Sequence, residues 1–574
     1  MSHESTTSSP IAPKHRRRSL LTLATLLVLA ALLRLIGIGW GLPSSAHLHS
    51  YHPDELANVQ ASRRIDWSDR QLDPGFYHHG TAYLIAVSLV DRVTEAVGLA
   101  PKRDDASPES WAATHRVARW LSWLCSVLTV WVAWLLARWR FGEGVAWVAA
   151  ALTAFAPLLI DTAHVAVPDA AVTLLSIVSL ALIDRLARSV NAPLGRGMIR
   201  SSIAGGAIGL AVATKLSGIL LLPVLAIGLW LSGTRWRRRG LNAVASTLAL
   251  AAVFVLASPP VWLATKPFFD ALEYELLVHP REGHQLLFVG TDPGWRYLLD
   301  RNLPIAIGGV FAIVGVFSVL AGLLAIIWRV IARERPQTGS TELLLLIWLG
   351  MGGLALSISE VRFIRYLAPF VPALAIVTAR VLLSPWALLP RLGRAVLIVL
   401  VAGVVIHTGW RGAARSLLYL GPDPRDRAAS WVQENVPPGD SIGVLSRPWY
   451  YSPPISPFNG RSHTDAAYQR WCRDEAPWRM IALGLDPGRL MAEQPDWVVI
   501  SSFEIAEEVR LGYPEAGRFL ALVQKGYRPA APPFQIEERL GPWKVETTDT
   551  AAGYPFPPHG WRYVNPTIWV YRKR

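Results

Sequence analysis

Long apolar runs separated by short polar connections fill the first 410 residues of the chain. The first run, residues 19–40, is long enough to cross the hydrocarbon core of a bilayer. Further runs lie near residues 79–99, 115–138, 142–160, 170–188, 201–232, 241–263, 304–328, 341–358, 366–383 and 395–410. A pattern of this kind predicts a polytopic α-helical membrane protein.

Clusters of basic residues sort these runs between the two sides of the membrane, because positively charged connections stay in the cytoplasm. Residues 1–18 are polar, end in a basic stretch and are followed by no evident signal-peptide cleavage site, which predicts a cytoplasmic tail and a retained first helix. Other arginine clusters lie at 185–200, 235–239, 329–335 and 391–394. If all four are cytoplasmic, residues 201–232 must form a hairpin of two short helices that turns near Lys215.

The same assignment places residues 41–78, 264–303, 359–365 and 411–574 outside. However, three runs separate the loop at 41–78 from the segment at 161–169, and three crossings would put these two on opposite sides. The run at 142–160 is short and contains Pro157, so we expect it to span incompletely. About 11 crossings of the plasma membrane then result.

After residue 410 the long apolar runs give way to short amphipathic elements. Residues 423–434 are predicted to form a helix, with Asp423 as its N-cap and Pro424 at its first position. Strands are expected at 441–445, 497–501 and 567–571, and a second helix at 514–524. The chain therefore divides into a tail, 1–18, a membrane module, 19–410, and an extracytoplasmic α/β domain, 411–574.

The composition agrees with this organisation. Hydrophobic residues make up 52% of the chain, charged residues only 17%, and the mean hydropathy is +0.31, which disfavours a soluble or disordered protein. The formal net charge of +14 is accounted for by the cytoplasmic connections, so it does not indicate nucleic-acid binding. Cys125 and Cys472 provide neither a disulfide framework nor a metal cluster.

Acidic residues at the outer edge of the membrane are the first candidates for chemistry. Asp54 and Glu55 follow Pro53 directly after the first span, and Asp169 opens a later apolar run. Carboxylates at these places also suit the positive end of a helix dipole, so an ordinary helix start is the competing interpretation. Adjacent carboxylates point about 100° apart on a helix, so Asp54 and Glu55 would have different tasks.

Cations in or beside the apolar runs are the second group. Arg34 lies within the first run, Lys215 interrupts the predicted hairpin, and Arg362 and Arg365 share one face at the start of a late span. Lysine and arginine suit a phosphate group, as a point charge and as a bidentate fork. The alternatives are snorkelling for Arg34 and anchoring to lipid head groups for Arg362 and Arg365.

Histidines in the two long outer loops form the third group. His52 precedes the acidic pair, and His279 and His284 lie in a loop that also contains several acids. Their spacing fits no strong zinc pattern, so we expect them to contact an acceptor or pack within the loop. A divalent metal in the reaction is left open.

Taken in order, these motifs resemble the GT-C glycosyltransferases, and within them the polyprenyl-phosphate-dependent branch of protein O-mannosyltransferases and bacterial aminoarabinose transferases. The resemblance covers residues 20–410 and rests on Asp54-Glu55, the helix start at Arg116–Arg119, Pro168-Asp169, the stretch Gly209–Lys215 and Arg365-Tyr-Leu-Ala-Pro369. The family often has His-Pro-Pro-Leu before its second span, whereas this chain has Tyr77-His-His-Gly-Thr81.

The resemblance implies a GT-C-like membrane module that moves a sugar from a polyprenyl monophosphate to a hydroxyl acceptor at the outer membrane face. It implies Asp54 as general base, with Glu55 and Asp169 orienting the substrates. Lys215, Arg365, Arg362 and Arg34 would hold the donor phosphate. The partners would be membrane lipids and an acceptor that is a protein, a glycan or a lipid of the cell envelope.

A polytopic transporter or flippase of an anionic or lipid-linked substrate is the main alternative, because charged residues in apolar runs occur there too. No inverted repeat is evident, and the acids lie in outer loops instead of at the middle of the membrane. A structural or adhesive protein would not need Arg34 or Lys215. The sequence does not distinguish among sugars, acceptors or oligomeric states.

Overall fold

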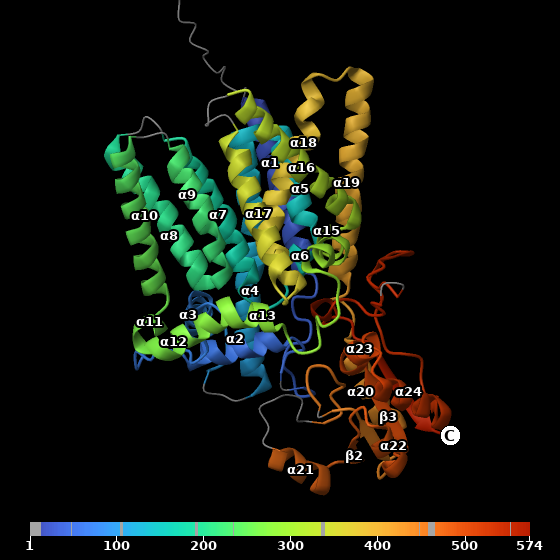
Figure 1. Ribbon diagram of the computed structural model, residues 1–574. Helices are drawn as coiled ribbons and strands as arrows, with labels where there is room; N and C mark the ends of the chain where they lie inside the picture. Colours follow the sequence, from blue (N-terminus) through green and yellow to red (C-terminus); the bar gives the residue numbers. More distant parts are fainter. Residues whose placement is uncertain are drawn as a thin grey trace, which may run out of the picture.

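The computed structural model describes residues 13–47, 49–103, 107–189, 193–232, 235–333, 339–446, 448–456, 465–550 and 553–574. Most of the predicted tail, residues 1–12, lies outside this part of the chain. A bundle of long helices makes up most of the structure, and a smaller α/β region lies at one end of it (Figure 1). The predicted combination of an α-helical membrane module with a carboxyl-terminal α/β region is thereby confirmed.

The bundle is built from helices and short helical turns up to Leu417. The α-helices are α1 (Pro13–Leu35), α2 (Pro53–Arg64), α3 (Thr81–Ala96), α4 (Pro108–Phe141), α5 (Glu143–Phe155), α6 (Pro157–Asp161), α7 (Asp169–Ala187), α8 (Leu194–Thr214), α9 (Leu221–Leu231), α10 (Trp236–Ala257), α11 (Pro260–Leu263), α12 (Thr265–Glu273), α13 (His279–Glu282), α14 (Gly294–Tyr297), α15 (Leu303–Ile307), α16 (Gly309–Ile331), α17 (Ser340–Ile358), α18 (Val371–Leu383) and α19 (Arg391–Leu417). Shorter 3-10 or π turns are η1 (Leu216–Leu220), η2 (Tyr274–Val278), η3 (Leu298–Asn302), η4 (Ile364–Phe370) and η5 (Ser384–Ala387).

Eight of the described helical segments are long and apolar enough to cross a membrane: α4, α7, α8, α10, α16, α17, α19 and the segment Ile364–Ala387. Shorter apolar helices lie at Leu21–Leu35, Glu143–Phe155 and Leu216–Leu231. The chain is therefore a multi-pass membrane protein. The number of about 11 crossings stays a prediction.

The predicted hairpin within residues 201–232 is present. Helix α8 ends at Thr214 because Lys215 adopts an extended conformation, and η1 and α9 then run back along the bundle. Glycines on α8 allow α10 to pack closely against it, since a Cβ added at Gly205 would lie only 2.0 Å from the carbonyl oxygen of Ser246. Helices α2 and α12 lie at one end of the bundle, which we call the site end (Figure 1). The turn at Lys215 lies there too, because the backbone of the preceding Thr214 touches Gly80 at the start of α3.

The run at 142–160 forms two helices, α5 and α6, and Glu143–Phe155 is one of the described apolar helices that are shorter than a membrane span. Helix α5 starts near Asp184, which binds Arg140 and Arg188 at the end opposite the site end. Helix α6 ends at Asp161, whose carboxylate oxygen lies 2.7 Å from Nε of Arg415, close to the end of α19 at the site end. Pro157 opens the second of these two helices.

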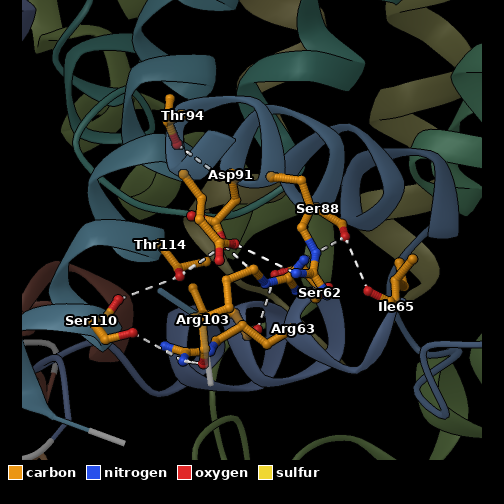
Figure 2. A network of polar contacts seen from close by, with 12 residues as sticks. Ser62, Arg63, Ile65, Ser88, Asp91, Thr94, Arg103, Ser110 and Thr114 are labelled. Atoms are coloured by element: carbon orange, nitrogen blue, oxygen red, sulfur yellow. Dashed lines mark hydrogen bonds and ion pairs between the residues drawn. The ribbon is translucent and has the colours of Figure 1, made fainter. Parts of the chain in front are cut away.

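The run at 79–99 forms α3, which is not among the described segments long and apolar enough to cross a membrane. Helix α3 lies beside α2 at the site end (Figure 1), and Figure 2 shows the polar network that Asp91 and Ser88 of α3 form with Arg103 and Ser62. Gly80, at its start, touches the backbone of Thr214, and near its other end Oδ2 of Asp91 lies 3.2 Å from Nε of Arg103. Arg103 also donates to the carbonyl of Ser62 in α2, at 2.7 Å. The loop at 41–78 and the segment at 161–169 meet at this end, since Nδ2 of Asn58 donates to the carbonyl of Ala166 at 3.0 Å.

The carboxyl-terminal region has the predicted mixed α/β character. Its sheet has the order β2-β1-β3-β7-β4, in which β2, β1 and β3 are parallel and β7 is antiparallel to β3 and β4. Its elements are α20 (Pro424–Asn435), β1 (Ser441–Val444), α21 (Asp465–Asp474), β2 (Arg479–Ala482), α22 (Pro487–Glu493), β3 (Trp497–Ser501), α23 (Ser502–Arg510), α24 (Pro514–Gly526), β4 (Tyr527–Pro529), β5 (Arg539–Leu540), β6 (Trp543–Lys544), η6 (His559–Trp561) and β7 (Ile568–Lys573). Asp423 caps α20 as predicted.

A segment between β6 and β7 fastens this region onto the site end. Trp561 is fully buried, and the guanidinium of Arg415 on α19 lies 3.7 Å from the centre of its ring. The indole N–H of Trp561 donates to Glu538, which lies 3.6 Å from Arg415. Two residues later, the ring of Tyr563 lies 4.3 Å from that of His52, next to the predicted catalytic loop.

Candidate functional site

An ion pair between Asp54 and Arg365 lies at the centre of the candidate site. Asp54 stands in the first turn of α2, which Pro53 opens, and Arg365 stands in η4. Oδ2 of Asp54 lies 2.9 Å from Nη2 of Arg365. The Asp54 side chain is 25% exposed, so it remains open to a small group that enters from outside. Phe363 packs 4.3 Å from the guanidinium and holds it in place.

A second ion pair lies beside the first. Nζ of Lys215 lies 2.6 Å from Oδ1 of Asp169, which is almost completely buried at the start of α7. The ammonium of Lys215 also lies 4.8 Å above the ring of Tyr366. Asp54 interacts electrostatically with Lys215, and Arg365 interacts with Asp169, so the four side chains form one cluster of two acids and two cations. We call these four residues the charge cluster.

The charge cluster controls the ionisation of Asp54. Burial alone would raise the pKa of this carboxyl, but the guanidinium of Arg365, with His52, His79 and Lys215, holds the pKa well below its usual range. Asp54 is therefore ionised at neutral pH and can accept a proton or a hydrogen bond. Its pairing with Arg365 makes it a weak base as long as that contact lasts.

Two histidines border the charge cluster. His79 shares a hydrogen bond of 2.7 Å with Oδ1 of Asn58 through its Nδ1, which must be the protonated nitrogen because an amide oxygen only accepts. Burial lowers the pKa of His79 to about 4 and also lowers the pKa of His52, so both rings are neutral at neutral pH. His52 lies against Tyr563, as described above. These rings provide neutral polar walls beside Asp54.

The two predicted loop histidines lie at the rim of the same site. Nε2 of His279 lies 3.4 Å from Nδ1 of His284, and the ring of His284 contacts Phe363. Glu275 joins this rim to His78, with an oxygen 3.0 Å from Nδ1. Within the described residues, no three His, Cys, Asp or Glu side chains are grouped so that they could hold a metal ion.

Glu55 does not point into the site. Its carboxylate is fully buried and binds the guanidinium of Arg119 through two contacts of 2.7 Å. It also accepts a hydrogen bond from the backbone of Ala166 at 2.6 Å. Glu55 thus joins α2 to α4 and to the segment before α7, and its predicted role in orienting substrates has no support in this geometry.

Arg34 also lies away from the charge cluster, and the structure gives it a different task. Pro157 has no N–H, so the carbonyl of Thr153 lacks its usual helical partner where α5 ends. The fully buried guanidinium of Arg34 donates to this carbonyl at 3.3 Å and to that of Ala154 at 2.8 Å. Arg34 therefore caps the end of α5 and is not placed to hold a phosphate.

Replacing Arg34 by Met should lower stability by about 1–3 kcal/mol, because the buried carbonyls of Thr153 and Ala154 would lose their donor. The measurement is thermal unfolding of the purified protein in detergent, with the exposed Leu32→Ala as control. Donor affinity of the folded variant should be unchanged. If Arg34→Met instead has a normal melting temperature and binds the lipid-phosphate donor more weakly, Arg34 contributes to phosphate binding and the capping role is wrong.

Arg362 is likewise engaged elsewhere. Its guanidinium donates to the carbonyl of Asp292 at 2.6 Å and to Glu360 at 2.9 Å, and it also binds the hydroxyl of Thr291. These contacts brace the loop 264–303 against the start of η4. Of the four predicted phosphate ligands, only Lys215 and Arg365 lie in the charge cluster.

The sequence did not single out several residues that border the site. Tyr366 follows Arg365 directly and His79 lies in a loop rich in histidine, so position alone offered some signal for both. His559 and Tyr563 come from the carboxyl-terminal region, about five hundred positions after Asp54 in the sequence. Their approach to Asp54 depends on the tertiary fold.

Comparison with known proteins relates this geometry to a family. Residues 112–263, which contain Arg119, Asp169 and Lys215, match the family model of dolichyl-phosphate-mannose-protein mannosyltransferase. No curated protein matches the chain. The match confirms the resemblance to lipid-phosphate-dependent glycosyltransferases that the sequence motifs predicted.

Several solved structures are similar to the chain at low identity. ArnT from Cupriavidus metallidurans in the apo state is 16% identical, with a TM-score of 0.48, over 96% of this chain and 98% of that chain. The oligosaccharyltransferase of Archaeoglobus fulgidus in the apo form is 16% identical, with a TM-score of 0.48, over 88% of this chain and 73% of that chain. The S. cerevisiae protein O-mannosyltransferase Pmt1-Pmt2 complex bound to the sugar donor is 15% identical, with a TM-score of 0.32, over 50% and 37%.

Proposed function

We propose that this protein transfers a sugar from a polyprenyl monophosphate to a hydroxyl acceptor at the outer face of the plasma membrane. The observation that carries the proposal is the charge cluster: a partly exposed carboxylate beside two cations, at the end of an apolar bundle. The match of residues 112–263 to a family of lipid-phosphate-dependent mannosyltransferases supports the same activity. In this proposal the amino terminus is cytoplasmic and the carboxyl-terminal region is extracytoplasmic.

Lys215 and Arg365 would hold the phosphate of the donor. Lysine supplies a point charge and arginine a planar fork that fits two phosphate oxygens. Both cations lie where apolar helices end, so the polyprenyl chain can stay in the bilayer while its phosphate reaches them. The sugar then projects toward Asp54 and the histidines that border it.

Asp54 would act as the general base. The oxygen of the acceptor hydroxyl forms a bond to the anomeric carbon, and its proton passes to the Asp54 carboxylate. The bond between the anomeric carbon and the phosphate oxygen breaks, and the polyprenyl phosphate leaves with the electron pair. Lys215 and Arg365 stabilise the charge that develops on the leaving phosphate.

Donor binding would also activate Asp54. In the free protein the guanidinium of Arg365 holds the carboxylate and weakens it as a base. A phosphate that binds Arg365 draws this guanidinium away and adds negative charge nearby, and both effects raise the pKa of Asp54. The base is thus strengthened only when the donor is present.

This exchange of partners predicts a difference between two pH profiles. The ionised carboxylate is the active form, so a lowered pKa in the free enzyme preserves kcat/KM as the pH falls from about 8 to about 5. In the donor complex the pKa is higher, so the acidic fall of kcat should begin at a higher pH than that of kcat/KM. Steady-state rates measured across this pH range show which of the two parameters falls first. If kcat and kcat/KM fall at the same pH, the proposed exchange of Arg365 from Asp54 to the donor phosphate is contradicted.

A transporter or flippase fits the structure less well. Helix α2, which carries Asp54, lies at one end of the bundle instead of halfway along it, and the adjacent His52 contacts Tyr563 of the carboxyl-terminal region (Figure 1). An alternating-access mechanism needs its binding site near the middle of the membrane.

The proposal is tested with purified protein in nanodiscs, a panel of radiolabelled polyprenyl-phosphate sugars and crude cell-envelope acceptors. Label should move from at least one donor to an acceptor. Donor uptake or flux across liposomes without any labelled product would support the transporter and overturn the transferase.

A further inference from the structure

A large cavity lies between the carboxyl-terminal sheet and the outer loop that follows α13. It has a volume of about 1070 Å³ and is lined by residues after β1, after β2 and after β3, together with the start of α24 and Gln285–Leu287. This volume is at the upper end of sites that take small organic ligands, about 300–1,000 Å³. The walls come from the described residues of both parts of the molecule.

The position of the cavity in the sheet is typical of a binding site. In open α/β sheets, ligands bind at the carboxyl ends of parallel strands, where the strand order reverses. Strand β1 lies between β2 and β3, so the chain reverses between β1 and β3. Trp449 and Tyr450, which follow β1, and Phe503 and Glu508, which follow β3, all line the cavity.

The chemistry of the walls selects the class of ligand. Aromatic rings of Trp449, Tyr450, Phe503 and Tyr513 offer flat apolar faces, and four glutamates stand among them. Glu504 is bound to Ser446 and Glu507 to Arg510 and Arg562, so Glu508 and Glu515 remain to accept hydrogen bonds from a ligand. Aromatic faces combined with carboxylates suit the apolar ring faces and the hydroxyls of a sugar. Among the described lining residues four glutamates face one arginine, Arg518, and this excess of negative charge disfavours an anionic ligand.

A chain of aromatic contacts leads from this cavity to the charge cluster. The ring of Phe503 stacks on that of Tyr563 at 5.6 Å, and Tyr563 lies 4.3 Å from His52, two residues before Asp54. His559 lines the cavity, contacts Tyr563 and interacts electrostatically with both Asp54 and Arg365. Its buried Nδ1 has no hydrogen-bond partner among the described residues, so it can bind a group that enters from the cavity.

We infer that this cavity is the acceptor site and that the acceptor is a neutral or amino-containing oligosaccharide. The inference rests on the proposed function, since it names the substrate whose hydroxyl reaches Asp54. The sugar rings lie on the aromatic walls, Glu508 and Glu515 accept from their hydroxyls, and the terminal hydroxyl passes His559 toward the charge cluster. The enzyme therefore extends a glycan instead of modifying a protein or a lipid directly.

The test is binding, measured apart from transfer. Saturation-transfer NMR with the full-length protein in nanodiscs is used to screen neutral tri- and tetrasaccharides of glucose, mannose and N-acetylglucosamine, together with chitosan oligomers. At least one should bind, and Trp449→Ala, Glu508→Gln and Tyr513→Ala should each weaken its affinity about tenfold through loss of a stacked ring or of a hydrogen bond. Trp543→Ala, a tryptophan 64% exposed outside the cavity, should bind normally.

The outcomes separate this inference from the proposed function. Saccharide binding should persist in Asp54→Asn, because that residue lies beyond the cavity. If the cavity variants lose saccharide binding but the wild type transfers no sugar, the saccharide site is supported and the proposed transferase activity is contradicted. The opposite result is transfer to a peptide or a lipid, together with no saccharide binding or with binding that the three substitutions do not change. That result would contradict the saccharide site and support the transferase activity.

Discussion

Sugar transfer by Asp54→Asn should be slower than that of the wild type by a factor of about 10² to 10⁴, the usual contribution of a general base. The amide has nearly the shape of the carboxylate but cannot take up the proton of the acceptor. The substitution also releases Arg365 from its ion pair, so the affinity for polyprenyl phosphate should stay the same or increase. Initial rates and lipid-phosphate binding, measured on the same preparation, check both parts.

The matched control for this experiment is Asp69→Asn, an exposed acid in the loop that follows α2. It should transfer sugar at the rate of the wild type. A rate for Asp54→Asn within tenfold of the wild type would remove Asp54 as the base. Asp169 would then be the next acid to test, because it belongs to the same charge cluster.

Glu55→Gln should destabilise the protein by about 3–5 kcal/mol, because it leaves the buried charge of Arg119 without its partner. Arg119 also donates to the carbonyls of Ile38 and Trp40, so the first outer loop, α2 and α4 depend on the same pair. Thermal unfolding in detergent should show a large fall in melting temperature, whereas Asp54→Asn should unfold nearly as the wild type does.

Glu109→Gln, an exposed acid in the first turn of α4, is the control for this change. Its melting temperature should stay near that of the wild type. If Glu55→Gln instead keeps its melting temperature and loses transfer, Glu55 acts in the chemistry and the structural role assigned to it is wrong. Substitution of Asp54 is therefore expected to lower the rate of transfer but not the stability, and substitution of Glu55 is expected to lower the stability.

Several features of the fold could be predicted because their causes are local. Lys215 interrupts an apolar run and marks the turn of the hairpin, and Asp423 with Pro424 marks the start of α20. The clusters of arginine placed the connections of the bundle correctly at one end (Figure 1). In each case the residue that decides the structure lies within the element it controls.

The course of residues 142–160 could not be predicted from local sequence alone, because it depends on a distant contact. Pro157 suggested a weak span, but Arg34, more than a hundred residues earlier, satisfies the carbonyls that the proline leaves without donors. The run at 79–99 carries a local signal against crossing. Asp91, Arg92 and Glu95 cluster near its end, and such charges are unfavourable inside a membrane.

The candidate site could be predicted only in part, because some of its residues are marked by local sequence and others depend on distant partners. Asp54, Asp169, Lys215 and Arg365 stand at helix boundaries, where the sequence marks them, and the structure brings all four together. Adjacent acids cannot be told apart without their partners, and Arg119, which binds Glu55, lies 64 positions away. The aromatic cavity depends on the return of residues 553–564 to the bundle, which no local pattern indicates.

The central claim is that a polyprenyl monophosphate leaves as its sugar reaches an acceptor hydroxyl. The most direct measurement is the amount of free polyprenyl phosphate and of glycosylated acceptor formed by purified protein in nanodiscs from one doubly labelled donor. The account predicts that the two products appear together in equal amounts and that Asp54→Asn suppresses both. Donor that is bound or moved across the bilayer with its sugar still attached, and no free polyprenyl phosphate, would contradict it.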